Sequence, residues 1–195
     1  MCRDPGLVRA VIPAGYMAKR VAARPEWLKR ERVADIYSVS NCASKDLAYF
    51  FKDSVLDWPL NGYWLFDSPE IIRQEALSHS VDLAETMLFF YEIHELEYDE
   101  DDGRWMSFEP SWPTRIVVPP TVSTLEGYDV VSFEQGTSPE CSPLSCNGLA
   151  SEVETNEHCL LPSFERAQQL LGDGQFDNSE PGPFRIFAVY SVGWS

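Results

Sequence analysis

Positive charge is scarce in this sequence. Its 195 residues include 15 lysines and arginines against 31 aspartates and glutamates, which gives a net charge of −16. A surface this acidic repels phosphate backbones, and nucleic-acid recognition needs a basic footprint. Eight of the basic residues fall within residues 1–32, and we expect them to pair with the acidic remainder. The charge therefore predicts no nucleic-acid partner and favours a basic protein partner, attracted by electrostatic steering.

Long apolar runs are absent as well. No stretch approaches the ~18 residues that a membrane-spanning helix needs, and the N-terminal residues lack the hydrophobic region and cleavage site of a signal peptide. The 5 cysteines are odd in number and irregularly spaced, which is typical of free thiols in a reducing compartment. We therefore expect a cytoplasmic protein with no membrane partner. The sequence leaves the oligomeric state open.

The common motifs of nucleotide, metal and nucleophile sites are also missing. The sequence has no GxGxxG, no GxxxxGK[ST], no HExxH and no GxSxG. No cofactor is predicted on this evidence.

Soft ligands and possible nucleophiles gather in residues 134–159. This stretch holds Cys141, Cys146, His158 and Cys159. A zinc site needs such side chains to converge tetrahedrally, usually from CxxC pairs. No CxxC is present, and adjacent residues such as His158 and Cys159 point to opposite faces of a strand. The spacing therefore predicts no metal site.

The same stretch offers a cysteine nucleophile. Cys146 lies near a short helix predicted around 143–151, and a place at its N-terminus would lower the thiol pKa. His158 would act as the base, with Asn156 or Glu154 as its orienting group. The competing interpretation is a structural turn that contains a packed cysteine. The loop 137–147 is where we would look for chemistry.

Local patterns predict a mixture of helices and strands. Ser68 before Pro69 and Glu70 is a clear helix start, because it combines a capping residue, proline in the first turn and an acid. Helices are expected at 44–52, 69–78, 143–151 and 163–171, and strands at 35–39, 62–66, 87–98, 104–108, 115–118, 128–133, 158–161 and 184–192. The fold class is therefore predicted as α+β (mixed α/β).

Segments on the two sides of a proline-rich connector can be laid over each other. Residues 61–70 match 156–165 at an offset of 95, and 89–96 match 184–191 at the same offset. DIYSV at 35–39 also matches DVVSF at 129–133, at an offset of 94. These matches predict an internal duplication with two similar βαβαβ-like halves, about 33–98 and 127–192. A hairpin and the connector, 99–126, join them within a single domain, 1–195.

Two functions follow from these observations. The first is a binding or interaction module that neutralises a basic protein partner, because the chain is acidic and lacks catalytic motifs. The alternative is a small cysteine-dependent hydrolase or transferase that uses Cys146, His158 and Asn156.

Overall fold

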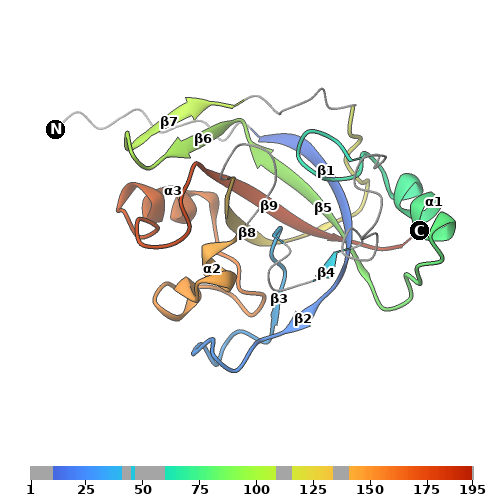
Figure 1. Ribbon diagram of the computed structural model, residues 1–195, viewed down its shortest axis with the longest axis horizontal. Coiled ribbons are helices and arrows are strands. Elements are labelled where there is room, and N and C mark those ends of the chain that lie inside the picture. The colour runs from blue at the N-terminus through green and yellow to red at the C-terminus, as the bar shows by residue number, and fades with distance from the viewer. Residues whose placement is uncertain (1–10, 41–44, 47–59, 109–115, 134–140, 195) are drawn as a thin grey trace.

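The centre of the protein is one antiparallel sheet. The computed structural model (Figure 1) describes residues 11–40, 45–46, 60–108, 116–133 and 141–194. Seven strands form the sheet in the order β4-β1-β5-β9-β6-β7, with β8 also paired with β9, and β2 pairs with β3 separately. The elements are β1 (Val11–Arg20), β2 (Ala22–Ala23), β3 (Asp35–Ile36), β4 (Lys45–Asp46), α1 (Pro69–Ser78), β5 (Met87–His94), β6 (Leu96–Asp99), β7 (Arg104–Ser107), β8 (Thr124–Ser132), α2 (Pro143–Cys146), a 3₁₀ helix (Leu149–Ser151), α3 (Phe164–Gly172) and β9 (Phe184–Val192). The predicted α+β class is confirmed.

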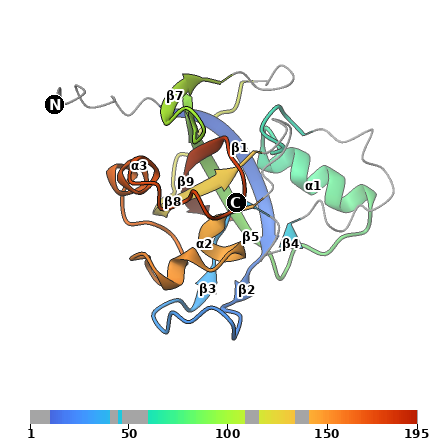
Figure 2. The same ribbon diagram turned by 60° about the vertical axis from the view of Figure 1, so that its left-hand side comes forward.

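The two longer helices begin where their capping residues predict. The Ser68 hydroxyl accepts a hydrogen bond from the Ile71 N–H at the start of α1. The Ser163 hydroxyl accepts one from the Arg166 N–H at the start of α3. In both views the helices lie on opposite sides of the sheet (Figures 1 and 2). None of the described helices has the length and apolar character that crossing a membrane requires.

Several predicted elements differ from the structure. The helix expected at 44–52 includes β4, and its residues 47–52 lie outside the described part of the chain. The strand expected at 35–39 is only the two-residue β3. Residues 116–118 have no regular structure. Ile36, Tyr37 and Val39 are buried although only two residues there pair with another strand, whereas Ile116 and Val118 are exposed. A strand pattern alone does not supply a partner strand.

The strands expected at 62–66 and 158–161 are tight turns instead, which we call the first corner (61–66) and the second corner (156–161). Each opens with an asparagine, Asn61 or Asn156, whose Oδ1 accepts hydrogen bonds from the N–H groups two and four residues later, at 2.9 and 3.3 Å or 2.9 and 3.0 Å. Its Nδ2 donates to a carbonyl of β1 or β8, at 2.7 or 2.6 Å. These side-chain bonds close the turn and replace a strand ladder.

Each corner lies against a glycine in a bulged strand. Gly15 in β1 has φ +143°, and Gly127 in β8 has φ +152°. A Cβ at Gly15 would lie 2.7 Å from the Leu65 Cβ, and one at Gly127 would lie 2.8 Å from the Leu160 Cβ. Only glycine allows this close approach.

Strand pairing follows the same scheme on both sides. Gly15 faces Tyr91 where β1 pairs with β5, and Gly127 faces Val189 where β8 pairs with β9. Corresponding positions are therefore 112 residues apart in β1 and β8 (127 − 15) and 98 apart in β5 and β9 (189 − 91). The two corner asparagines are 95 residues apart (156 − 61), which is the offset at which the sequence segments were matched. For β5 and β9 the offset of 95 is three residues smaller than the separation of 98 between their paired positions.

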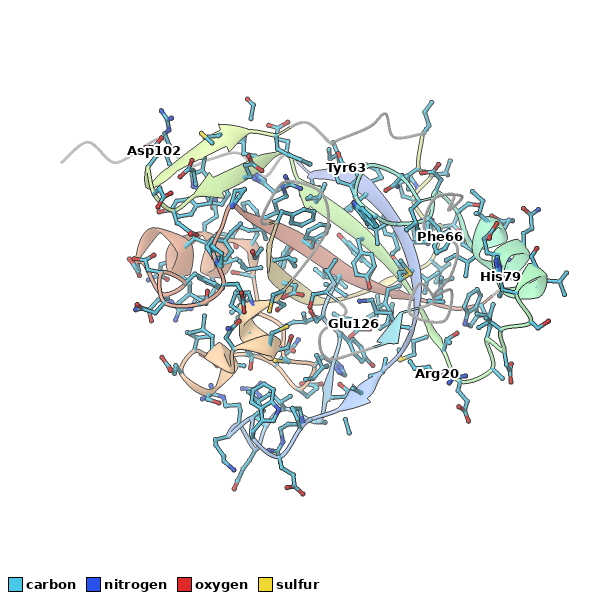
Figure 3. All side chains as sticks on the ribbon, in the orientation of Figure 1. Arg20, Tyr63, Phe66, His79, Asp102 and Glu126 are labelled. Atoms are coloured by element: carbon cyan, nitrogen blue, oxygen red, sulfur yellow. The ribbon has the colours of Figure 1, made fainter. Side chains whose placement is uncertain are left out.

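The apolar side chains form two clusters, one for each helix. The first contains Tyr16, Ile72 and Ala76, and the second contains Tyr128 and Phe164. Figure 3 shows Phe66, the last residue of the first corner, between β1 and α1. The corners therefore connect the sheet to each helix and place the first helical turn next to a tyrosine of the sheet.

Candidate binding site

The predicted nucleophile, Cys146, was expected at a helix N-terminus. It is instead the last residue of α2. Its Sγ lies 3.7 Å from the Ser40 Oγ and 3.9 Å from the Ser145 Oγ. The side chain is partly buried. Of the loop 137–147, only residues 141–147 fall within the described part of the chain.

The predicted base, His158, contacts a different set of groups. Its Nδ1 lies 2.6 Å from the Asp35 Oδ1, its Nε2 lies 3.7 Å from the Glu126 Oε2, and its ring stacks on Tyr37 at 4.0 Å. No described hydrogen bond joins His158 to Cys146. The histidine is therefore oriented by two carboxylates.

The predicted orienting residue, Asn156, serves the second corner. Its Oδ1 accepts from the His158 backbone N–H and the Leu160 N–H, and its Nδ2 donates to the Glu126 carbonyl. Glu154, its alternative, lies 3.7 Å from Arg32 at the surface. Asp35, and not the predicted Asn156 or Glu154, therefore makes the short contact with the imidazole.

The cysteine-rich stretch does not assemble a metal site in the described residues. No group of three or more His, Cys, Asp and Glu side chains there is placed to hold a metal ion, and this includes Cys141, Cys146, His158 and Cys159. Cys159 is buried in an apolar cluster, and this burial raises its pKa to about 12. The thiol of Cys159 is therefore a packing group at neutral pH.

A buried lysine and a buried aspartate hold residues 38–40. The Lys19 Nζ donates to the three carbonyls of this segment at 2.6–2.9 Å. The Asp129 carboxylate accepts from the Ser38 hydroxyl, the Val39 N–H and the Ser142 hydroxyl. Burial raises the pKa of Asp129 to about 6, although these hydrogen bonds oppose the rise. Sequence reasoning missed both residues, because each lies in a strand among apolar neighbours.

A cleft of about 680 Å³ lies at the start of α1, and we call it the α1 cleft. Its lining comes from four parts of the chain: Tyr16, residues 67–71, residues 116 and 118–122, and residues 192–194. Tyr16 is only 3% exposed, and its hydroxyl donates to the Val118 carbonyl at 2.6 Å. The tyrosine therefore forms the floor and is fixed there.

The rim of the α1 cleft is unusually apolar for a surface. Ile116 is 92% exposed, Val118 is 69% exposed and Val122 is 80% exposed. Contiguous exposed apolar side chains next to a hollow are typical of a binding surface.

The charged side chains that line the α1 cleft are both acidic. Asp67 is largely buried and accepts a hydrogen bond from Asn61, whereas Glu70 lies in the first turn of α1. Hydrogen bonds from its own backbone N–H and from Ser68 lower the pKa of Glu70. Burial, and then the charge of Glu70, raise the pKa of Tyr16 to about 12. The cleft therefore carries a negative potential that favours cations.

One basic residue lies beside the cleft. The Arg73 guanidinium lies 5.4 Å from the centroid of the Trp194 ring and 3.7 Å from Glu70. The Trp194 indole N–H donates to the Thr86 carbonyl at 3.1 Å, which fixes the ring. Arg73 is not part of the lining, so it only partly offsets the two carboxylates.

The corresponding place beside α3 is filled. Phe164, at the first helical position, lies 4.8 Å from His94 and 6.3 Å from Tyr128, measured between ring centroids. Trp105 of β7 packs against the edge of His94 at 5.5 Å. The chain thus closes this place with its own aromatic rings.

Sequence reasoning missed the α1 cleft because its parts are far apart along the chain. One signal was present: the apolar run at 116–118 comes directly before Pro119 and Pro120, which do not extend a central strand. Comparisons with protein-family models, with curated proteins and with solved structures give no match, so what the chain does has to be inferred from its own residues.

Proposed function

We propose that this protein is a binding module whose α1 cleft takes a segment of a basic protein partner. The observation that carries the proposal is a cleft of about 680 Å³ that is lined by two carboxylates and bordered by exposed apolar side chains. Apolar contact supplies affinity at such a site, and opposite charge supplies orientation and a fast encounter. The net charge of −16 adds long-range attraction for a basic partner.

A cytoplasmic location and a single domain belong to the same proposal. The described cysteines Cys141, Cys146 and Cys159 are free thiols, as expected in a reducing compartment. We also propose that the domain arose by internal duplication. Two similarities support it. The asparagine of each corner accepts a hydrogen bond from the N–H two residues later, and the glycine of each bulged strand faces a residue of the neighbouring long strand. In this proposal the first repeat begins at β1, earlier than residue 33.

Calorimetry with synthetic peptides tests the binding proposal. A lysine-rich peptide is titrated into the wild-type protein and into the variant Asp67→Asn/Glu70→Gln. We expect binding to weaken about tenfold in the variant at low salt, because both lost charges line the cleft. The control Asp101→Asn/Glu152→Gln removes the same charge from exposed sites elsewhere and retains affinity. Equal weakening by both variants would mean that only the overall charge matters.

The alternative proposal is the cysteine-dependent hydrolase or transferase. The close contact between His158 and Asp35, at 2.6 Å, supports an oriented imidazole, with Asp35 in the place first given to Asn156. In this proposal the Cys146 thiol reacts with iodoacetamide well below its ordinary pKa of about 8.5. Replacing His158 by Gln then abolishes the low-pH reactivity. An unchanged profile in His158→Gln removes this alternative.

A further inference from the structure

The aromatic side chains that pack beside α3 indicate what kind of side chain would fit in the α1 cleft. The strand registers and the corners make Tyr16 the counterpart of Tyr128, and Ser68 the counterpart of Ser163. Pro69 therefore stands where Phe164 stands in the second half. By the 98-residue relation of β5 and β9, Val192 is the counterpart of His94 (192 − 94).

The three counterparts all line the α1 cleft. Tyr16, Pro69 and Val192 are separate lining residues there, whereas Tyr128, Phe164 and His94 pack against one another. The second half is closed by the large ring of Phe164 and by Trp105, which lies against His94. In the first half a proline ring replaces the phenylalanine, and the cleft remains open.

We propose that the partner segment places an aromatic side chain in the α1 cleft, against Tyr16, Pro69 and Trp194, with a lysine or arginine next to it in sequence. This inference rests on the proposed function and names the chemistry of its partner. The ring supplies the aromatic bulk that Phe164 supplies beside α3 and that Pro69 lacks.

The position of the acids sets where the positive charge lies. Asp67 and Glu70 flank Pro69, so a cation that neighbours the seated ring meets a carboxylate. A ring flanked by positive charge is therefore favoured, and a ring flanked by acids is repelled.

The extent of the apolar rim favours a protein segment over a free aromatic metabolite. Ile116 and Val122 line the cleft and are exposed by 92% and 80%, so a partner must cover a wide apolar surface to bury them. Neighbouring residues of a bound segment cover this surface, and an isolated ring does not.

Three peptides of equal length test the inference by calorimetry. Their central residues are Lys-Trp-Lys, Lys-Ala-Lys and Glu-Trp-Glu, in a glycine-serine background, and free tryptophanamide is measured beside them. We expect Lys-Trp-Lys to bind at least tenfold more tightly than either other peptide and than tryptophanamide. Equal binding of the Trp and Ala peptides overturns this inference and leaves the proposed function standing. If neither Lys-Trp-Lys nor Lys-Ala-Lys binds, both this inference and the proposed function are overturned. Tryptophanamide as tight as the peptide identifies a small-molecule site and overturns the protein-segment proposal.

A variant that fills the α1 cleft tests where the aromatic ring of the peptide binds. Pro69→Phe copies Phe164 and closes the cleft with the chain's own ring, so we expect the preference for Trp over Ala in the peptide to disappear. The matched control is Leu77→Phe, at an 83% exposed position later in α1 and outside the cleft lining. It retains the preference. Circular dichroism verifies that both variants fold. If Pro69→Phe does not fold, Pro69→Leu places a smaller apolar side chain at the same position, and we expect it to lose part of the preference. A retained preference in a folded Pro69→Phe places the ring elsewhere and overturns the inference.

Discussion

The places beside α1 and α3 are built on the same frame and differ in what fills them. Both have an asparagine-closed corner, a glycine in a bulged strand and a serine that caps the helix. Beside α3, Phe164 and Trp105 complete an apolar cluster, whereas Pro69 beside α1 leaves a cleft. The two places therefore share a frame, and the residue at the first helical position is where they differ: Phe164 lies in a filled core, and Pro69 lines an open cleft.

Truncating the two first helical residues tests this difference most strongly. Phe164→Ala removes a ring that is 2% exposed, and we expect it to lower the free energy of unfolding by about 3–5 kcal/mol. Pro69→Ala removes a ring from a cleft wall, and we expect a change below about 1 kcal/mol. Urea denaturation of both variants measures the difference. Equal losses would mean that Pro69 is part of the core.

The two halves also differ at another pair of positions, one of which holds a buried ionisable side chain, Asp129. Asp129 corresponds to Met17 in β1, which is also buried (129 − 17 = 112). The pKa of Asp129 is about 6 in the folded protein against an ordinary 3.8, so the folded state binds the proton more tightly. The stability from this group is present below pH 3.8 and is lost as the pH rises through 6.

The Asp129→Asn variant measures that effect. We expect the free energy of unfolding of the wild type, relative to the variant, to fall by on the order of 2–3 kcal/mol between pH 4 and 7. Urea denaturation at several pH values gives this difference directly. Parallel pH profiles for wild type and variant would show that Asp129 does not titrate in this range.

The corner asparagines are expected to be equally important. Asn61→Ala and Asn156→Ala each leave two backbone N–H groups and one carbonyl without a partner. We expect each to cost about 2 kcal/mol, measured by urea denaturation. A loss confined to one of the two would contradict the view that the frame is the same in both halves.

The smallest effect concerns the cation beside the cleft. Arg73 lies at the surface, so Arg73→Ala should change stability by less than about 1 kcal/mol. Its removal makes the cleft more negative, and we expect affinity for the Lys-Trp-Lys peptide to rise about two- to threefold at low salt. Weaker binding would instead place Arg73 in contact with the peptide.

Local signals predicted part of this structure. Ser68 and Pro69 identified α1, and the continuous apolar run at 184–192 identified β9, because caps and hydrophobic runs act within one element. The corners were predicted as strands, since their residues are apolar. There a single asparagine side chain replaces the ladder, and Trp64 and Cys159 have φ of 60° and 63°.

The α1 cleft could not be predicted from sequence, because four distant segments form it. Matching 61–70 with 156–165 paired the two asparagines whose side chains close the corners, since those residues keep one spacing. The matches between strands gave the wrong registers, because apolar strand residues resemble one another at any offset. The comparison of Pro69 with Phe164 was therefore available from sequence, but its meaning depends on Tyr16 and Val192, which only the fold brings together.

The location of the bound peptide tests the central claim most directly. In a ¹⁵N-labelled titration with the Lys-Trp-Lys peptide, amide shifts are measured for the whole protein. We predict that the largest shifts fall at residues 16, 67, 68, 70, 71, 118 and 192–194, and that Trp105 and Phe164 are unaffected. Shifts concentrated around Trp105 and Phe164, or spread evenly over the acidic surface, would contradict the α1 cleft as the binding site.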